Sequence, residues 1–414
     1  MTRRRVVVTG LGVLSPVGTD TATTWRALLD GVSGADFITQ FDATKFPVRF
    51  ACEVKGFDPL QYMDRKEAKR SDVYAQLALA AAVQAIEDAG LAPGTYDPDT
   101  TGVIIGSGIG GLKIFEAQHD QYRDRGPSKI SPFFIPMFIP DMAAGIVSIR
   151  LNAKGPNYAT VSACATSAHA IGDAFRTIQY GDADVMITGG SEAAITPMAI
   201  GGFANMQALS ERNDDPRTAS RPFDKDRDGF VMGEGAGVVV LEELEHARRR
   251  GARMYAEIVG YGATGDAYHI TQPAPEGEGA QRSMRRALRD AGVGPADVQY
   301  INAHGTSTPY NDLNETLAIK AVFGEHAKAL KVSSTKSATG HTLGAAGGIE
   351  FVVCTLTVHD GAIPPTINYT TPDPECDLDY VPNKCLRQDV DIALSNSFGF
   401  GGHNVTLAVR RLRD

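Results

Sequence analysis

One cysteine in the chain stands in surroundings that favour nucleophilic chemistry. Residues 161–170 read VSACATSAHA, in which an apolar stretch gives way to small residues, so Cys164 should stand where a helix begins. Free amides and the helix dipole there favour an anion, and cysteine pKa values can fall to roughly 3.5–7.5 in such places. We therefore expect Cys164 to react as a thiolate nucleophile. The alternative is a buried structural cysteine, which would not require small neighbours that leave room for a substrate.

Two histidines lie beside predicted strand ends and helix starts in the second part of the sequence. His304 belongs to NAHGTST, residues 302–308, directly after an apolar strand, where parallel sheets present functional groups. His341 belongs to KSATGHTLGAAGG, residues 336–348, near a helix start. Two imidazoles there could donate Nε2 hydrogen bonds to a thioester oxygen and stabilise an enolate. Taken alone, each histidine could simply bond to its own loop, and Lys336 could be an electrostatic partner or a solvated side chain.

A glycine-rich turn near the end of the sequence is the third candidate element. Residues 396–404 read NSFGFGGHN and separate two short apolar runs, which is typical of a β-hairpin. The amides of this turn could complete an oxyanion hole, and Phe398 and Phe400 could gate a pocket. A plain hairpin turn is the alternative interpretation.

A repeated sequence pattern indicates how these groups are positioned. Residues 85–93, AIEDAGLAP, recur as residues 287–295, ALRDAGVGP, and each copy resembles a helix that ends at glycine before an apolar strand. Alternating strands and helices imply right-handed crossovers and largely parallel, buried sheets. The sequence thus predicts two duplicated α/β halves that divide near Gly251. The longer first half carries extra segments, which we expect to shape binding surfaces.

The composition of the chain and its incomplete motifs exclude several classes of function. The 40 basic and 49 acidic side chains give a formal net charge of −9, without a concentrated basic patch for nucleic acid. The five cysteines lack the spacing of a zinc site. Residues 224–229 imitate a calcium loop but have Gly235 at the twelfth position, and residues 10–12 lack the third glycine of a dinucleotide fingerprint. We expect no signal peptide or membrane helix, and a soluble, cytoplasmic protein.

Together these motifs resemble the β-ketoacyl-acyl-carrier-protein synthases over nearly the whole chain. The most specific matches are ACATS at residues 163–167, RPFD at 221–224, DGFVMGEGAG at 228–237 and NAHGTST at 302–308. The resemblance implies a thiolase-like α/β fold of two duplicated halves, with mixed, largely parallel five-stranded sheets layered as αβαβα. Residues 1–251 would carry the nucleophile and the insertions, and residues 252–414 the two histidines.

The resemblance also implies a decarboxylative Claisen condensation of acyl and malonyl carrier proteins. Cys164 would accept the acyl group, while His304 and His341 would hold the malonyl thioester and promote loss of CO2. The amides of Cys164 and Phe400 would form the oxyanion hole. The implied supporting residues are Lys336 and Glu350. No metal or organic cofactor is implied, because the phosphopantetheine arm arrives with the carrier, past Thr306 and Thr308.

Further residues are implied for the acyl pocket and for the partners. The implied pocket residues are Ile109, Phe134, Ile135, Phe203, Phe398 and Phe400, of which Phe134 and Ile135 would come from the second subunit of a homodimer. The implied carrier-docking residues are Lys66, Lys69, Arg70 and Lys129. Close relatives often have basic residues where this chain has Ser128 and Gln207, so its docking patch would be weaker or differently placed.

Several related activities compete with this interpretation. SGIGG at residues 107–111 resembles the type II synthases of fatty acid elongation, because type I enzymes tend to carry glycine in place of Ile109. A thiolase would need a second catalytic cysteine, and an initiating synthase would have asparagine in place of His341. A type II polyketide ketosynthase subunit uses the same residues and stays open. A non-catalytic chain-length partner would lack Cys164.

Overall fold

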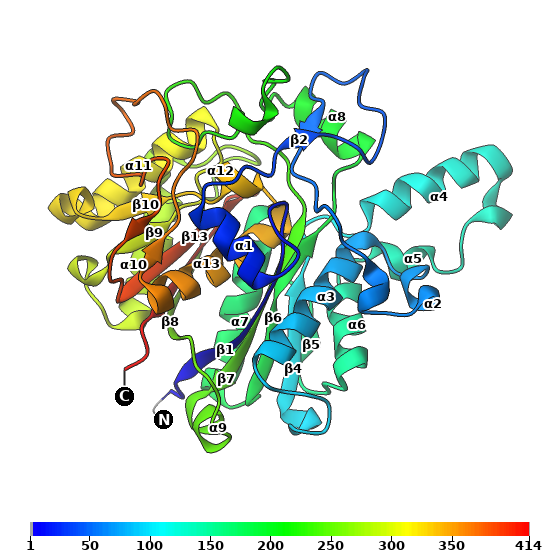
Figure 1. Ribbon diagram of the computed structural model, residues 1–414, viewed down its shortest axis with the longest axis horizontal. Coiled ribbons are helices and arrows are strands. Elements are labelled where there is room, and N and C mark those ends of the chain that lie inside the picture. Colours follow the sequence, from blue (N-terminus) through cyan, green and yellow to red (C-terminus); the bar gives the residue numbers. More distant parts are fainter. Residues whose placement is uncertain (1–2, 414) are drawn as a thin grey trace.

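The computed structural model describes residues 3–413, in which one ten-stranded mixed sheet is the central element (Figure 1). The strand order is β10-β9-β13-β14-β8-β1-β7-β6-β4-β5. The first half of the chain supplies β1 (Val6–Leu14), β4 (Thr101–Gly106), β5 (Asn157–Tyr158), β6 (Val185–Glu192) and β7 (Gly235–Glu243). The second half supplies β8 (Ala256–Gly265), β9 (Tyr300–Asn302), β10 (Lys331–Ser333), β13 (Ile392–Gly399) and β14 (His403–Arg410). Two short ribbons, β2 (Asp36–Phe37) with β3 (Phe50–Ala51) and β11 (Ala362–Ile363) with β12 (Leu386–Arg387), lie outside the sheet.

The prediction of largely parallel sheets was wrong. In each half two strand pairs are parallel, β4 with β5 and β6, and β9 with β10 and β13, while the other two pairs are antiparallel. The pattern of alternating helices and strands could not show this, because β7 pairs antiparallel with β6 although a helix lies between them, and β14 follows β13 through a tight turn. The two halves of the sheet are also joined, since β1 pairs with β8 through three residues.

Helices cover the sheet on its outer faces and fill the space between its two halves. The helices are α1 (Thr21–Leu29), α2 (Arg65–Ala68), α3 (Val73–Asp88), α4 (Leu112–Arg125), α5 (Phe134–Phe138), α6 (Met142–Leu151), α7 (Thr166–Tyr180), α8 (Pro197–Asn205), α9 (Leu244–Arg249), α10 (Glu278–Ala291), α11 (Pro309–Phe323), α12 (Lys336–Thr339) and α13 (Ala346–Asp360). Helices α7 and α13 pack between the halves and share one apolar core with strands of both. Helices α3 and α6 cover the outer face of the first half, and α10 covers that of the second with α11 packed beside it (Figure 1). None of the helices in residues 3–413 is long and apolar enough to span a membrane.

The repeat in the sequence corresponds to a repeated close contact between a strand and a helix. Two glycines of β1 lie against backbone carbonyls of α3, and two glycines of β8 lie against the matching carbonyls of α10. The contacts are Gly10 with Ala85, Gly12 with Ala81, Gly260 with Ala287, and Gly262 with Ser283. The glycines at residues 10–12 therefore have a packing role, in agreement with the rejected dinucleotide motif. The predicted division into residues 1–251 and 252–414 stays a prediction.

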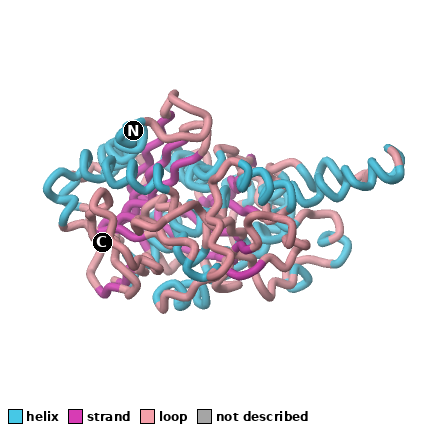
Figure 2. Tube along the Cα trace, turned by 90° about the horizontal axis from the view of Figure 1, so that it is seen from above, coloured by secondary structure: helices cyan, strands magenta, loops and turns pink. Residues whose placement is uncertain are grey.

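One insertion projects from the body as an arm, formed by α4, α5 and the segment between them (Figures 1 and 2). Neither helix of the arm has a buried residue. Three phenylalanine rings, those of Phe115, Phe134 and Phe138, pack on one another along it. Ile130 and Ile135 remain exposed on the arm. An exposed apolar surface of this kind is typical of a protein contact.

Alanine substitutions at the paired glycines test the repeated contact. A Cβ atom at Gly12 would lie 1.9 Å from the carbonyl oxygen of Ala81, and one at Gly262 would lie 2.0 Å from that of Ser283. We expect Gly12→Ala and Gly262→Ala each to lower the free energy of unfolding by about 1–3 kcal/mol or more, because the strand must move away from its helix. Chemical denaturation measures the change.

Gly145 supplies the matched control, because it lies within α6 and a Cβ atom there would meet nothing within 4 Å. Gly145→Ala should keep or raise the stability, by up to about 1 kcal/mol. Wild-type stability in both strand variants would contradict the proposed close packing.

Candidate active site

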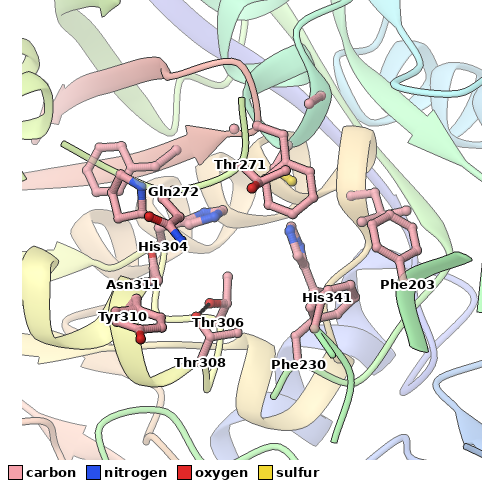
Figure 3. A pocket seen from close by; sticks show the side chains of 18 of the residues that line it. Phe203, Phe230, Thr271, Gln272, His304, Thr306, Thr308, Tyr310, Asn311 and His341 are labelled. Carbon is pink, nitrogen blue, oxygen red and sulfur yellow. Dashed lines mark hydrogen bonds between the residues drawn. The ribbon is translucent and has the colours of Figure 1, made fainter. Parts of the chain in front are cut away.

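A cavity of about 670 Å³ lies where the carboxyl ends of several strands meet (Figure 3). Gly108 follows β4, Glu192 ends β6, His304 follows β9 and Phe398 lies at the end of β13, and all four line the cavity. Both halves of the chain therefore contribute to it. This is the edge at which α/β sheets commonly bind ligands.

Cys164 lies in a tight turn at the bottom of this cavity. The turn is the 3₁₀ helix η4 (Ala163–Ala165), which leads directly into α7. Ala163 has a φ of +50°, a left-handed conformation that costs energy for a residue other than glycine. The hydroxyl of Thr166 stabilises the turn, since it donates to the Ala163 carbonyl at 2.7 Å and accepts from the Ser162 amide at 2.9 Å. The turn aims the side chain of Cys164, which is 8% exposed, into the cavity.

The structure brings both predicted histidines to this cysteine. The Cys164 Sγ atom and one ring nitrogen each of His304 and His341 lie within 4.8 Å of one another. The two imidazole rings are 5.2 Å apart between centroids and nearly perpendicular, and both point into the cavity (Figure 3). A sulfur and two ring nitrogens at this spacing are also ligands that a zinc ion accepts. The expected absence of a metal therefore stays a prediction.

Burial keeps both imidazoles neutral at physiological pH. It lowers the pKa of His304 well below its ordinary value, with smaller contributions from the charge of Lys336 and from His341. It also lowers the pKa of His341 well below 6.5, again with a contribution from Lys336. Each neutral ring can donate one hydrogen bond. The Nδ1 atoms of both rings have no hydrogen-bond partner within residues 3–413.

The expectation of a resting thiolate at Cys164 was wrong. Burial raises the pKa of the Cys164 thiol to about 12, although the charge of Lys336 and the backbone N–H groups of Phe400 and Cys164 lower it in part. The helix start favours an anion, but the cost of desolvating a charged sulfur outweighs that effect. Cys164 therefore rests as a thiol, and it must lose its proton as it attacks.

Lys336 is a buried ionic partner and not a solvated side chain. Its ammonium group pairs with the Glu350 carboxylate, and both side chains are almost fully buried. Lys336 lies on α12 and Glu350 on α13. Burial raises the pKa of Glu350, and the Lys336 charge opposes that rise. The pair places one positive charge close enough to influence the cysteine and both histidines.

The glycine-rich turn between β13 and β14 lies directly over Cys164. A Cβ atom at Gly399 would be 2.7 Å from the Ser162 carbonyl oxygen and 3.1 Å from the Cys164 amide nitrogen, so this contact requires glycine. The amide of Phe400 reaches the cysteine sulfur. The Phe400 ring lies 6.4 Å from that of Phe203 between centroids. Two amides thus reach the thiol, and two aromatic rings line the same cavity.

Most of the predicted pocket residues line this cavity, and the others lie on or beside the arm. The lining residues among them are Ile109, Phe203, Phe398, Phe400, Thr306 and Thr308. Phe134 and Ile135 are on α5 in the arm and do not line it. The four exposed basic residues proposed for docking, Lys66, Lys69, Arg70 and Lys129, also lie outside it. The guanidinium of Arg70 stacks on Phe133 of the arm, 4.2 Å from the ring centroid.

Two buried glutamates at the site were missed by the sequence analysis. Glu315 on α11 accepts hydrogen bonds from the amides of His304 at 2.9 Å and Gly305 at 2.8 Å, so it fixes the backbone that carries the histidine. Glu192 lines the cavity itself. A signal in the sequence existed for Glu192, because it ends an apolar strand, which is an unusual place for a carboxylate.

Family models and similar proteins match this chain along nearly its whole length. The family model described as "Beta-ketoacyl synthase, N-terminal domain" matches residues 3–247, and that described as "Beta-ketoacyl synthase, C-terminal domain" matches residues 255–370. The 3-oxoacyl-[acyl-carrier-protein] synthase 2 of Staphylococcus aureus (strain COL) is 59% identical over 99% of this chain and 98% of its own length. The protein of the same name from Synechocystis sp. is 57% identical over 99% and 98%.

Solved structures of related enzymes share the same fold. The structure described as the ishigamide ketosynthase/chain length factor has a TM-score of 0.93 and 36% identity, covering 99% of this chain and 100% of that chain. A type II polyketide acyl-carrier protein in complex with its ketosynthase, AntDE:AntF, contains a chain with a TM-score of 0.92 and 37% identity, covering 99% and 100%.

The rate at which Cys164 is alkylated should report its protonation. Because the pKa of this thiol is raised to about 12, the thiolate fraction should increase about tenfold per pH unit from about pH 6 to pH 9, without a plateau. Mass spectrometry of the Cys164 peptide after brief iodoacetamide treatment gives the rate, and free N-acetylcysteine in the same tube corrects for the reagent. A plateau below about pH 8 would show that the thiol ionises as the helix-start argument first suggested.

Proposed function

The chain belongs to the β-ketoacyl synthase family, and we propose that Cys164, His304 and His341 carry out its condensing reaction. It is a condensing enzyme of fatty acid chain elongation, an acyltransferase of the 3-oxoacyl-[acyl-carrier-protein] synthase 2 type that acts on acyl-carrier-protein thioesters, as the sequence analysis predicted. The identity of 57–59% to such synthases favours this activity over a polyketide ketosynthase, to which the solved relatives are 36–37% identical. The observation that carries the proposed residue roles is the meeting of one sulfur and two imidazole nitrogens within 4.8 Å.

The first step transfers the acyl group to Cys164. The sulfur attacks the thioester carbonyl of the acyl carrier, its proton leaves as the new bond forms, and the pantetheine thiol of the carrier departs with a proton. The tetrahedral oxyanion is stabilised by the amides of Cys164 and Phe400, which both reach the sulfur. Thr306 and Thr308, which line the cavity and share a 2.9 Å hydrogen bond (Figure 3), contact the pantetheine arm.

The second step couples decarboxylation to carbon–carbon bond formation. Neutral His304 and His341 each donate a hydrogen bond to the thioester oxygen of the malonyl carrier, which stabilises the enolate as CO2 leaves. The enolate carbon then attacks the carbonyl of acyl-Cys164, and the sulfur departs and takes up a proton from solvent, because its own proton left with the thiol of the first carrier. Lys336 and Glu350 support this step, because the buried positive charge adds to the effect of burial that keeps both rings neutral, and it favours the departing thiolate.

A homodimer would complete the acyl pocket. The arm projects from its own subunit (Figure 2). It carries Phe134 and Ile135 on α5, and Ile130 and Ile135 are exposed on it. Such an arm suits insertion against a second copy, where these side chains would approach the partner's cavity. The docking residues lie on or beside the same arm, so they would bind an acidic carrier near that cavity. A relative solved with its acyl-carrier protein supports a carrier as partner, and the cytoplasmic location stays a prediction.

Condensation with malonyl carrier tests the proposed roles directly. With acyl carriers of graded length, the wild-type protein should give β-ketoacyl carriers extended by two carbons, identified by mass, and the yield should survive a metal chelator. Cys164→Ala should give none. His304→Ala and His341→Ala should each lower the decarboxylation rate by about 10²–10³-fold or more, because an oxyanion donor is lost, while acyl labelling of Cys164 continues.

His359→Ala is the control, because this histidine is exposed near the end of α13 and lies outside both the cavity and the arm. It should condense at the wild-type rate. Condensation by Cys164→Ala would remove the nucleophile from the proposal, and wild-type turnover in either cavity histidine variant would remove that histidine.

Charge reversal tests the proposed docking residues. The double variant Lys66→Glu/Lys69→Glu should raise KM for the acyl carrier by about tenfold at low salt and less at high salt, with kcat unchanged, because rim charges act mainly on encounter. Steady-state condensation rates measure both constants. Lys328→Glu, which changes an exposed lysine on η8 (Gly324–Lys328), is the control. An unchanged KM in the double variant would place the carrier elsewhere.

A further inference from the structure

A carboxylate without a cationic partner in residues 3–413 lies in the wall of the cavity. Glu192 is fully buried at the end of β6, and four donors point at its two oxygens. Its Oε1 atom accepts from the Ser107 hydroxyl at 2.8 Å and the Ile109 amide at 3.2 Å. Its Oε2 atom accepts from the amides of Gly108 at 2.9 Å and Gly344 at 3.0 Å. Burial raises the pKa of Glu192 to about 7, although all four bonds run towards the carboxylate and lower that pKa in part.

These four donors belong to two loops from different halves of the chain. Residues 107–109 follow β4, while Gly344 lies in the turn η9 (Leu343–Ala345) that starts α13, three residues after His341. A Cβ atom at Gly344 would lie 2.3 Å from the Gly108 amide nitrogen and 2.6 Å from Glu192 Oε2. The two loops are therefore in direct contact, and one carboxylate holds both.

The loop after β4 has little freedom except towards the cavity. A Cβ atom at Gly111 would meet the Met137 carbonyl oxygen at 2.3 Å, and one at Gly110 would meet that of Phe138 at 2.7 Å, so the arm closes this side. On the other side the loop faces the cavity, which Ile109 lines. A loop released by Glu192 would consequently move into the space that an acyl chain needs.

We propose that Glu192 is a positioning residue that sets acyl-chain length. It holds the Ile109 loop and the Gly344 turn in the wall of the cavity, so that they do not move inward and long acyl chains fit beside Cys164. This inference rests on the proposed function, since it concerns the acyl group that Cys164 accepts. Short acyl groups need only the region near the sulfur, whereas long ones must pass Ile109. The carboxylate therefore acts on selectivity through the loop and does not touch the reacting atoms.

Replacement of the carboxylate by an amide tests this role. In Glu192→Gln an NH2 group replaces one of the two carboxylate oxygens. Each oxygen accepts from two donors, at least one of which is a backbone amide, so the NH2 group must face an amide N–H. We expect the rate of Cys164 acylation by a dodecanoyl carrier to fall at least about tenfold relative to the rate with an acetyl carrier, since displacements of about 1 Å can cost 10²-fold. Single-turnover labelling followed by intact mass gives both rates on the same protein.

Glu234→Gln is the matched control. Glu234 is also buried, accepts from the Gln40 side chain at 2.8 Å and the Val54 amide at 3.0 Å, has no cationic partner among the described residues, and does not line the cavity. Its variant should keep the wild-type ratio of long-chain to short-chain rates, whatever it loses in stability. A wild-type ratio in Glu192→Gln, or the same change in Glu234→Gln, would overturn the proposal.

Two further comparisons keep the test decisive. If Glu192→Gln does not fold, Ser107→Ala removes one donor and leaves the carboxylate, and it should shift the ratio in the same direction by a smaller factor; a wild-type ratio there would also overturn the proposal. Wild-type protein that no acyl carrier labels would defeat the proposed function itself. Wild-type labelling with an unchanged ratio in the variants would defeat only the role of Glu192.

Discussion

Exclusion of water from the space between the two halves is the constraint on which the site depends. It raises the pKa of the Cys164 thiol and lowers those of His304 and His341, so the reacting groups are neutral at rest. Each neutral imidazole carries one N–H group, which can donate a hydrogen bond to an oxygen that becomes negative. The buried Lys336 of the Lys336–Glu350 pair lowers the pKa of the Cys164 thiol and of both histidines in part, whereas the Glu192 carboxylate raises that of the thiol.

The duplicated architecture explains why such a site forms at a junction. In each half of the chain, strands end at the cavity and a central helix begins there. The turn before that helix contains a residue with a positive φ, Ala163 before α7 and Leu343 before α13. The first turn presents a thiol to the cavity. The second presents the Gly344 amide, which donates a hydrogen bond to the carboxylate of Glu192. Two copies of one unit thus supply a nucleophile and a fixed wall, and the close packing of α7 and α13 keeps them together.

The sequence was sufficient to find Cys164 and both histidines, because each lies in a distinctive segment directly beside a strand end or helix start. The repeated helix in the sequence corresponds to matching contacts of α3 with β1 and of α10 with β8, while the division into two duplicated halves stays a prediction. The sequence could not give the sign of the thiol pKa shift, because desolvation depends on contacts between distant segments. Glu192 was missed for the same reason, since its donors come from loops far away in the sequence. Glu315 was missed because the fold of the loop before α11, and not the spacing of residues, brings its carboxylate to the amides of His304 and Gly305. The antiparallel strand pairs left no trace in the helix pattern.

The most direct test of this account is the protonation of the two cavity histidines in the folded enzyme. Nitrogen NMR of protein with ¹⁵N-labelled histidine, assigned with His304→Ala and His341→Ala, distinguishes neutral from charged rings. At about pH 5.5, one unit below the ordinary value near 6.5, we expect both cavity rings to be neutral, because burial lowers their pKa values. An imidazolium signal from either ring at that pH would contradict the claim that burial sets the chemistry of the site.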